Sequence, residues 1–177
     1  MKISIAYIFV LLFIIFAGPG FSRTCPARSR DHLTEQEAGL VADTQELDKR
    51  TVVFIKAIER RFLVISNPNA TQSNKDKEIW GPLPTGTHAE LIEDIHKIID
   101  EAITNIENVN ERDPSNPLIV KSLRKLSDAC KGYVVQLSSI QEKSQDEREL
   151  RAIAKALDNA QEVIDAAQKL PPVKTKQ

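Results

Sequence analysis

Glu93 and His96 form the pair whose spacing in this sequence most resembles a metal site. In ferritin-like helical proteins, an E-x-x-H motif on each of two helices supplies inward-facing carboxylate and imidazole ligands to iron. Here the pair falls on the helix face opposite the apolar stripe, and no second E-x-x-H occurs. We therefore expect no metal and no cofactor, and we interpret Glu93 and His96 as part of a solvated surface.

The other residues capable of chemistry lack the context that catalysis needs. No serine or cysteine stands in a nucleophile motif such as G-x-S-x-G, and no C-x-x-C-H is present for haem attachment. The six glycines are scattered rather than gathered in a phosphate-binding loop. His32 and His88 stand at expected helix starts, where histidines are common. We therefore expect no catalytic residue and a protein that is not an enzyme.

The long irregular connection over residues 67–86 is the candidate binding loop. It carries the only tryptophan, Trp80, and three of the nine prolines. Connections of this length are uncommon and are often functional. Ser73 predicts a short capped helical turn over residues 74–80. Trp80 and Leu83 then either fold down with Ile79 as a lid over one end of the core, or present a surface to a protein partner.

Arg60 and Arg61 are the candidate charged residues beside this loop. They adjoin Phe62 and could bind an anion or a carboxylate near Trp80. Such arginines more commonly form a charged helix face, and the pattern places Arg60 on the polar side of its helix.

The elements that must position these residues are organised around residues 119–140. A seven-residue apolar repeat continues there for three heptads, which is typical of a helix packed lengthwise against other helices. Asp113 and Pro114 predict its start. The apolar positions are Ile119, Leu123, Leu126, Cys130, Tyr133, Leu137 and Ile140.

Three further helices are predicted around this one. Capping boxes at Thr34 and Thr87 begin helices that continue to about Ser66 and Asn108. The first of these would be roughly 50 Å long. A third capping box at Ser144 begins the last helix, which the prolines at 171–172 end.

Four amphipathic helices joined mostly by short turns predict an all-α fold, an antiparallel up-down-up-down four-helix bundle over residues 33–170. The alternative is a three-helix bundle from which the first helix protrudes. Residues 23–32 are predicted to form a flexible tether and residues 171–177 a disordered tail.

Residues 1–22 have the pattern of a secretory signal peptide. Lys2 precedes an uncharged run over residues 3–17, and helix-breaking glycine and proline follow before a small residue, Ser22. The alternative is an uncleaved membrane anchor formed by residues 3–21, which approach the minimum length for spanning a bilayer. We therefore expect export to the periplasm or the extracellular space, or attachment to a membrane through this segment alone.

Charge and cysteine content limit the partners. The net charge is −1, or −2 once Lys2 is removed with the signal, so no basic excess exists to attract nucleic acid. Cys130 falls on the apolar seam, where a free cysteine behaves as a small hydrophobe. A disulfide between Cys25 and Cys130 is chemically allowed after export, but it would require the tether to fold back along the helices.

The functional expectation is an exported, non-enzymatic helical protein that binds or scaffolds a protein partner. Long helices and the expected absence of polar residues from the apolar seams favour this reading. The alternative is a carrier that holds a small apolar ligand between helices, which the broad isoleucine face of residues 91–106 favours.

Overall fold

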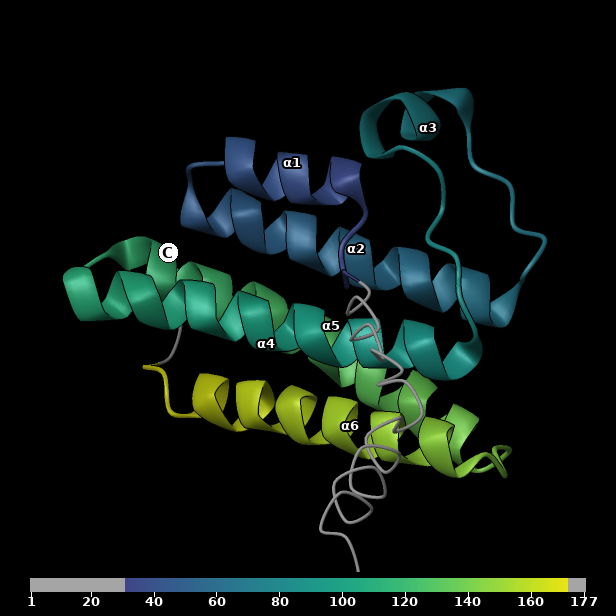
Figure 1. Cartoon of the computed structure of the whole chain (residues 1–177). Helices are drawn as coiled ribbons and strands as arrows, with labels where there is room; N and C mark the ends of the chain where they lie inside the picture. The colour runs from purple at the N-terminus through teal and green to yellow at the C-terminus, as the bar shows by residue number, and fades with distance from the viewer. Residues whose placement is uncertain (1–30, 172–177) are drawn as a thin grey trace, which may run out of the picture. The chain divides into compact units, whose positions relative to one another are not determined.

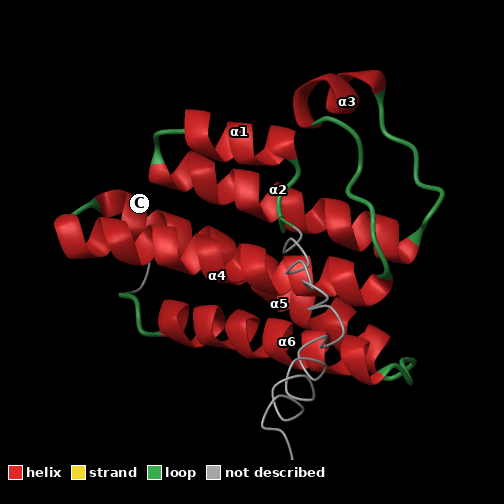
Figure 2. Ribbon diagram, in the orientation of Figure 1, coloured by secondary structure: helices red, strands yellow, loops and turns green. Residues whose placement is uncertain are grey.

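The computed structural model describes residues 31–171. The expected signal segment, nearly all of the expected tether and residues 172–177 of the tail lie outside the described residues. The described part of the chain is all-helical, with six helices and no strand (Figure 2). The helices are α1 (Glu35–Asp43), α2 (Leu47–Ser66), α3 (Asn74–Trp80), α4 (His88–Arg112), α5 (Pro117–Gln141) and α6 (Glu147–Gln168).

The expectation of one continuous helix from residue 34 to residue 66 is wrong. α1 ends at Asp43, and after a short turn α2 runs back beside it (Figure 1). The hydroxyl of Thr44 donates to the Leu40 carbonyl at 2.7 Å, and Nε of Arg50 donates to the Thr44 carbonyl at 2.8 Å. These bonds satisfy carbonyls at the break, which no proline or glycine marks in the sequence.

Capping signals located three of the six helix starts in the described part of the chain. Thr34 and Thr87 both form the predicted capping boxes, and Ser73 caps α3 as expected. Two predicted starts are wrong. α5 begins after Asn116 rather than at residues 113–114, because Asn116 caps it and a proline follows at its first position. α6 is capped by Asp146 rather than by a box at residue 144, because the Asp146 carboxylate accepts from two backbone N–H groups.

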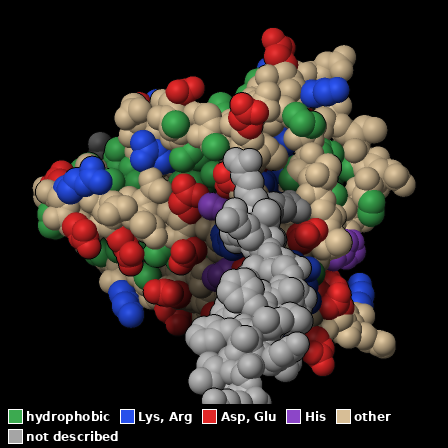
Figure 3. All heavy atoms as spheres, in the orientation of Figure 1, with side chains coloured by type: hydrophobic (Ala, Val, Ile, Leu, Met, Phe, Trp, Pro, Cys, Tyr) green, Lys and Arg blue, Asp and Glu red, His purple; other side chains and the backbone are tan. Residues whose placement is uncertain are grey.

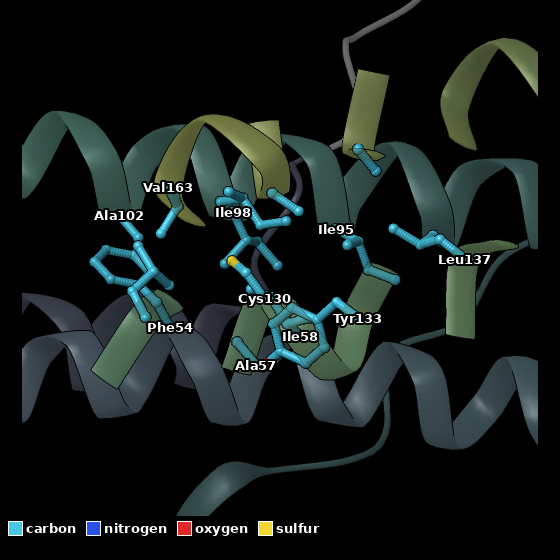
Figure 4. Packing of buried hydrophobic residues seen from close by; sticks show 14 of the residues in the cluster. Phe54, Ala57, Ile58, Ile95, Ile98, Ala102, Cys130, Tyr133, Leu137 and Val163 are labelled. Carbon is cyan, nitrogen blue, oxygen red and sulfur yellow. The ribbon is translucent and has the colours of Figure 1, made fainter. Parts of the chain in front are cut away.

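The four long helices enclose one hydrophobic core. α2 and α6 each pack against both α4 and α5, whereas no Cα pair joins α2 and α6 within 8 Å. Buried side chains from all four helices meet in the interior (Figure 4). The labelled members are Phe54, Ala57 and Ile58 of α2, Ile95, Ile98 and Ala102 of α4, Cys130, Tyr133 and Leu137 of α5, and Val163 of α6.

The predicted seam of α5 lies at the centre of this core. Leu126, Cys130, Tyr133 and Leu137 are buried, and the flanking members of the seam are partly buried. Cys130 is a free thiol. Burial raises the pKa of this thiol to about 12, so it stays protonated and packs as a small apolar group. Cys25 lies outside the described residues.

Candidate functional site

A buried group of four charged side chains joins α1, α2 and α4. We call it the Glu37 cluster (Glu37, Arg60, Arg61 and Asp94), and no member is more than 3% exposed. Oε2 of Glu37 lies 2.7 Å from Nη2 of Arg61, and its Oε1 lies 3.0 Å from Nε of Arg60. Oδ2 of Asp94 lies 3.9 Å from Nε of Arg61. Two positive and two negative charges therefore balance in the interior, as buried ions require.

Backbone carbonyls complete the surroundings of Arg61. Its Nη1 donates to the Ala57 carbonyl at 2.7 Å, and its Nη2 donates to the His32 carbonyl at 2.6 Å. The backbone N–H of Thr34 donates to Glu37 at 2.9 Å. Because these bonds join the segment before α1 to the middle of α2, the cluster anchors α1 on the core.

The expectation that the apolar seams carry no polar cluster, with Arg60 on the polar face of its helix, is wrong. Phe54, Ile58, Arg61 and Ile65 are spaced 4, 3 and 4, so Arg61 occupies a seam position. That spacing is the signal that could have revealed the burial of Arg61. Glu37 was recognisable only as a capping residue, because its pairing with α2 depends on the turn that reverses the chain.

Arg60 also holds the loop between α2 and α4. Its Nη2 donates to the carbonyl of Pro82 at 2.5 Å, and its guanidinium carbon lies 5.9 Å from the centre of the Trp80 ring. Burial lowers the pKa of Arg60, an effect that the Glu37 carboxylate opposes. Gly81 ends α3 with a φ of +67°, a conformation that favours glycine, and a Cβ there would lie 2.5 Å from the Gln36 side chain.

The structure brings three of the four candidate residues together. Arg60, Trp80 and Leu83 line a small pocket of about 100 Å³ beside the exposed Leu63. Arg61 is not part of this pocket, since its guanidinium lies in the Glu37 cluster. Ile79 is 45% exposed, so it does not fold down as part of a lid.

The E-x-x-H pair makes contacts with α6. Glu93 lies 3.4 Å from Nζ of Lys155, and Nδ1 of His96 lies 3.1 Å from the side-chain nitrogen of Asn159. His96 is partly buried rather than fully solvated, and desolvation lowers its pKa. Within residues 31–171, no group of three or more His, Cys, Asp or Glu side chains could hold a metal ion.

A hollow of about 570 Å³ lies where the ends of α2 and α5 meet the starts of α4 and α6. Its lining includes His88, Ser144 and Glu149, three residue types that serve in catalysis. The Ser144 hydroxyl donates to Glu149 at 3.0 Å, and the His88 ring lies 3.7 Å from the same carboxylate. The Ser144 hydroxyl therefore donates to a carboxylate and not to the His88 imidazole, so the three residues do not form the Ser–His pair that commonly activates a serine nucleophile.

An apolar hollow of about 280 Å³ lies between the ends of α4 and α6 and the start of α5. We call it the α4–α5–α6 hollow. Most of its walls are aliphatic, and two glutamates and one asparagine complete it. Its lining residues are Ile103, Ile106, Glu107, Asn110, Ile119, Leu123, Glu162, Val163, Ala166 and Leu170.

Within residues 31–171, no helix combines the length and the apolar character that crossing a bilayer requires. No protein-family model, curated protein or solved structure matches the chain.

Proposed function

We propose that this chain is an exported, non-enzymatic protein whose helices α2, α4, α5 and α6 form an antiparallel four-helix bundle, and that it binds a protein partner through residues 67–86. The pairwise packing of the four helices and the short connections after α4 and α5 support the bundle. The signal-like sequence of residues 1–22 supports export.

The observation that carries the binding proposal is an exposed apolar surface on an anchored loop. Ile79 is 45% exposed and Leu63 of α2 is 43% exposed, and the half-buried Trp80 ring lies beside the Arg60 guanidinium. The bond from Arg60 to the Pro82 carbonyl fixes the loop before any partner arrives. A preorganised loop loses less conformational entropy on binding, and tryptophan is a frequent hot-spot residue at protein interfaces.

Site-specific photo-crosslinking tests this proposal. A photoreactive residue at position 79 is expected to capture a defined partner from the native secretome or envelope, whereas the same residue at Val135, which is 69% exposed on α5, is not. The substitution W80A is expected to weaken binding of that partner at least tenfold, by about 1.4 kcal/mol or more. If positions 79 and 135 captured the same proteins, or if W80A bound the partner with unchanged affinity, the proposal that residues 67–86 bind the partner would be refuted.

The second candidate is a carrier of a small apolar ligand, and the α4–α5–α6 hollow favours it. The broad isoleucine face of α4 is buried in the core, where Ile92, Ile95, Ile98 and Ile99 pack in one cluster. Octanol is expected to shift the amide resonances of the hollow's lining residues, and L123W is expected to abolish the shift by filling the space. Absence of any shift in the unaltered protein would contradict this function.

A further inference from the structure

We propose that the α4–α5–α6 hollow binds small amphipathic amines, in which a short apolar chain carries one positive charge. This inference rests on the second candidate function and names its ligand class. The apolar walls would hold the chain, and Glu107 and Glu162 would hold the ammonium group.

The size and walls of the hollow set the apolar part of the ligand. At about 280 Å³ the hollow is slightly smaller than the sites that hold drug-sized molecules, so it fits a short chain rather than a long acyl chain. The aliphatic part of the wall comes from three helices, with Ile103 and Ile106 of α4, Ile119 and Leu123 of α5 and Val163 of α6. Each methylene that enters contributes about 0.8 kcal/mol at most.

The charge around the hollow sets the sign of the head group. Glu107 and Glu162 are exposed and form no ion pair within residues 31–171, although both line the hollow. The nearby basic residues of α5 are engaged elsewhere: Lys121 and Lys125 pair with Asp48, and Arg124 donates to the carbonyl of Pro171. Acidic side chains are frequent over α4 and α6 on the face that Figure 3 shows.

The charges at the helix ends also favour a positively charged head group. α4 and α6 both finish beside the hollow, and the carboxyl end of a helix carries a partial negative charge. α5 begins there and contributes one positive end. Two negative helix ends and two lining carboxylates therefore outweigh one positive end, and no lysine or arginine is among the described residues that line the hollow, so the opening favours a cation.

Three probes with the same eight-carbon chain separate the contribution of the head-group charge to the affinity from the contribution of the apolar chain. Octylamine, octanol and octanoate are titrated into the full chain, and dissociation constants are taken from amide shifts of the lining residues. Octylamine is expected to bind about fivefold more tightly than octanol, the scale of two exposed ion pairs. Octanoate is expected to bind most weakly.

Two double variants complete the test. E107Q/E162Q is expected to bind octylamine and octanol equally, because only the charge is removed. E78Q/E142Q removes the same charge from exposed residues that do not line the hollow, and it is expected to keep the preference. Equal binding of all three probes to the unaltered chain would overturn the amine specificity while leaving an apolar site. Binding of none would overturn the site itself, and the loop-mediated function would be unaffected by either result.

Discussion

Replacing Glu37 by glutamine would test whether the Glu37 cluster anchors α1. Glutamine has nearly the same shape, but it is neutral and one of its acceptor oxygens becomes an NH₂ group. Arg60 and Arg61 would then have only Asp94 to balance two buried positive charges. An NH₂ group would also face guanidinium donors that now lie 2.7–3.0 Å from the carboxylate.

The expected cost is large because Glu37 has no exposed surface and Arg61 is 1% exposed. Removing one partner of a buried ion pair typically costs about 3–5 kcal/mol. That is a large share of the roughly 5–15 kcal/mol that stabilises a domain. At roughly 3 °C per kcal/mol for a domain of this size, E37Q is expected to lower the melting temperature by roughly 10 °C.

Urea unfolding followed by circular dichroism would measure the difference in free energy of unfolding. E35Q is the matched control, since Glu35 lies in the same first turn of α1 but is exposed, and its loss is expected to change stability by less than about 0.5 kcal/mol. Amide exchange would show whether α1 opens separately from the core. A cost for E37Q below about 1 kcal/mol, with α1 still protected, would refute the view that the cluster is a desolvated anchor.

Three further outcomes are expected. Lys121, which lies 2.6 Å from Asp48, lowers the pKa of that carboxyl, so the pair stabilises the fold above the ordinary pKa and this contribution is lost as the pH falls through the lowered value. The stability advantage of the native chain over D48N should therefore shrink from about pH 6 to about pH 3 in urea titrations. Peptide mapping after treatment with a thiol reagent should find Cys130 unmodified until urea unfolds the chain, and early modification would contradict its burial. Expression in a eukaryotic secretory host should add a glycan at the exposed Asn69 of the N-A-T sequon, seen as a mass increase that N69Q lacks, and an unmodified intracellular product would count against export.

Local chemistry was enough to locate most helices. Thr34 and Thr87 form their capping boxes with glutamates three residues later, and such bonds depend on the sequence of one turn. The same is true of Ser73 and α3. The buried face of α5 could be predicted from the sequence because a seven-residue apolar repeat places its residues on one face of the helix, which packs against the neighbouring helices.

Local sequence signals did not predict the break between α1 and α2. The apolar spacing from Leu33 through Leu40 and Leu47 to Phe54 continues across it, and Thr44 is no more than a weak helix breaker. The chain reverses because the turn satisfies its own backbone and because Glu37 reaches Arg61 of α2 only after the reversal. The binding loop was identified by its length and its tryptophan, but its attachment through Arg60 depends on a contact across 22 residues.

The sequence by itself therefore determined the helical periodicity, the caps and the position of the long loop, because these depend on residues within a few turns of one another. Only the tertiary structure decided which charges are buried and where hollows remain. The buried charges of Glu37 and Arg61 pair only because tertiary folding brings α1 beside α2. The hollows likewise depend on how neighbouring helices end against one another.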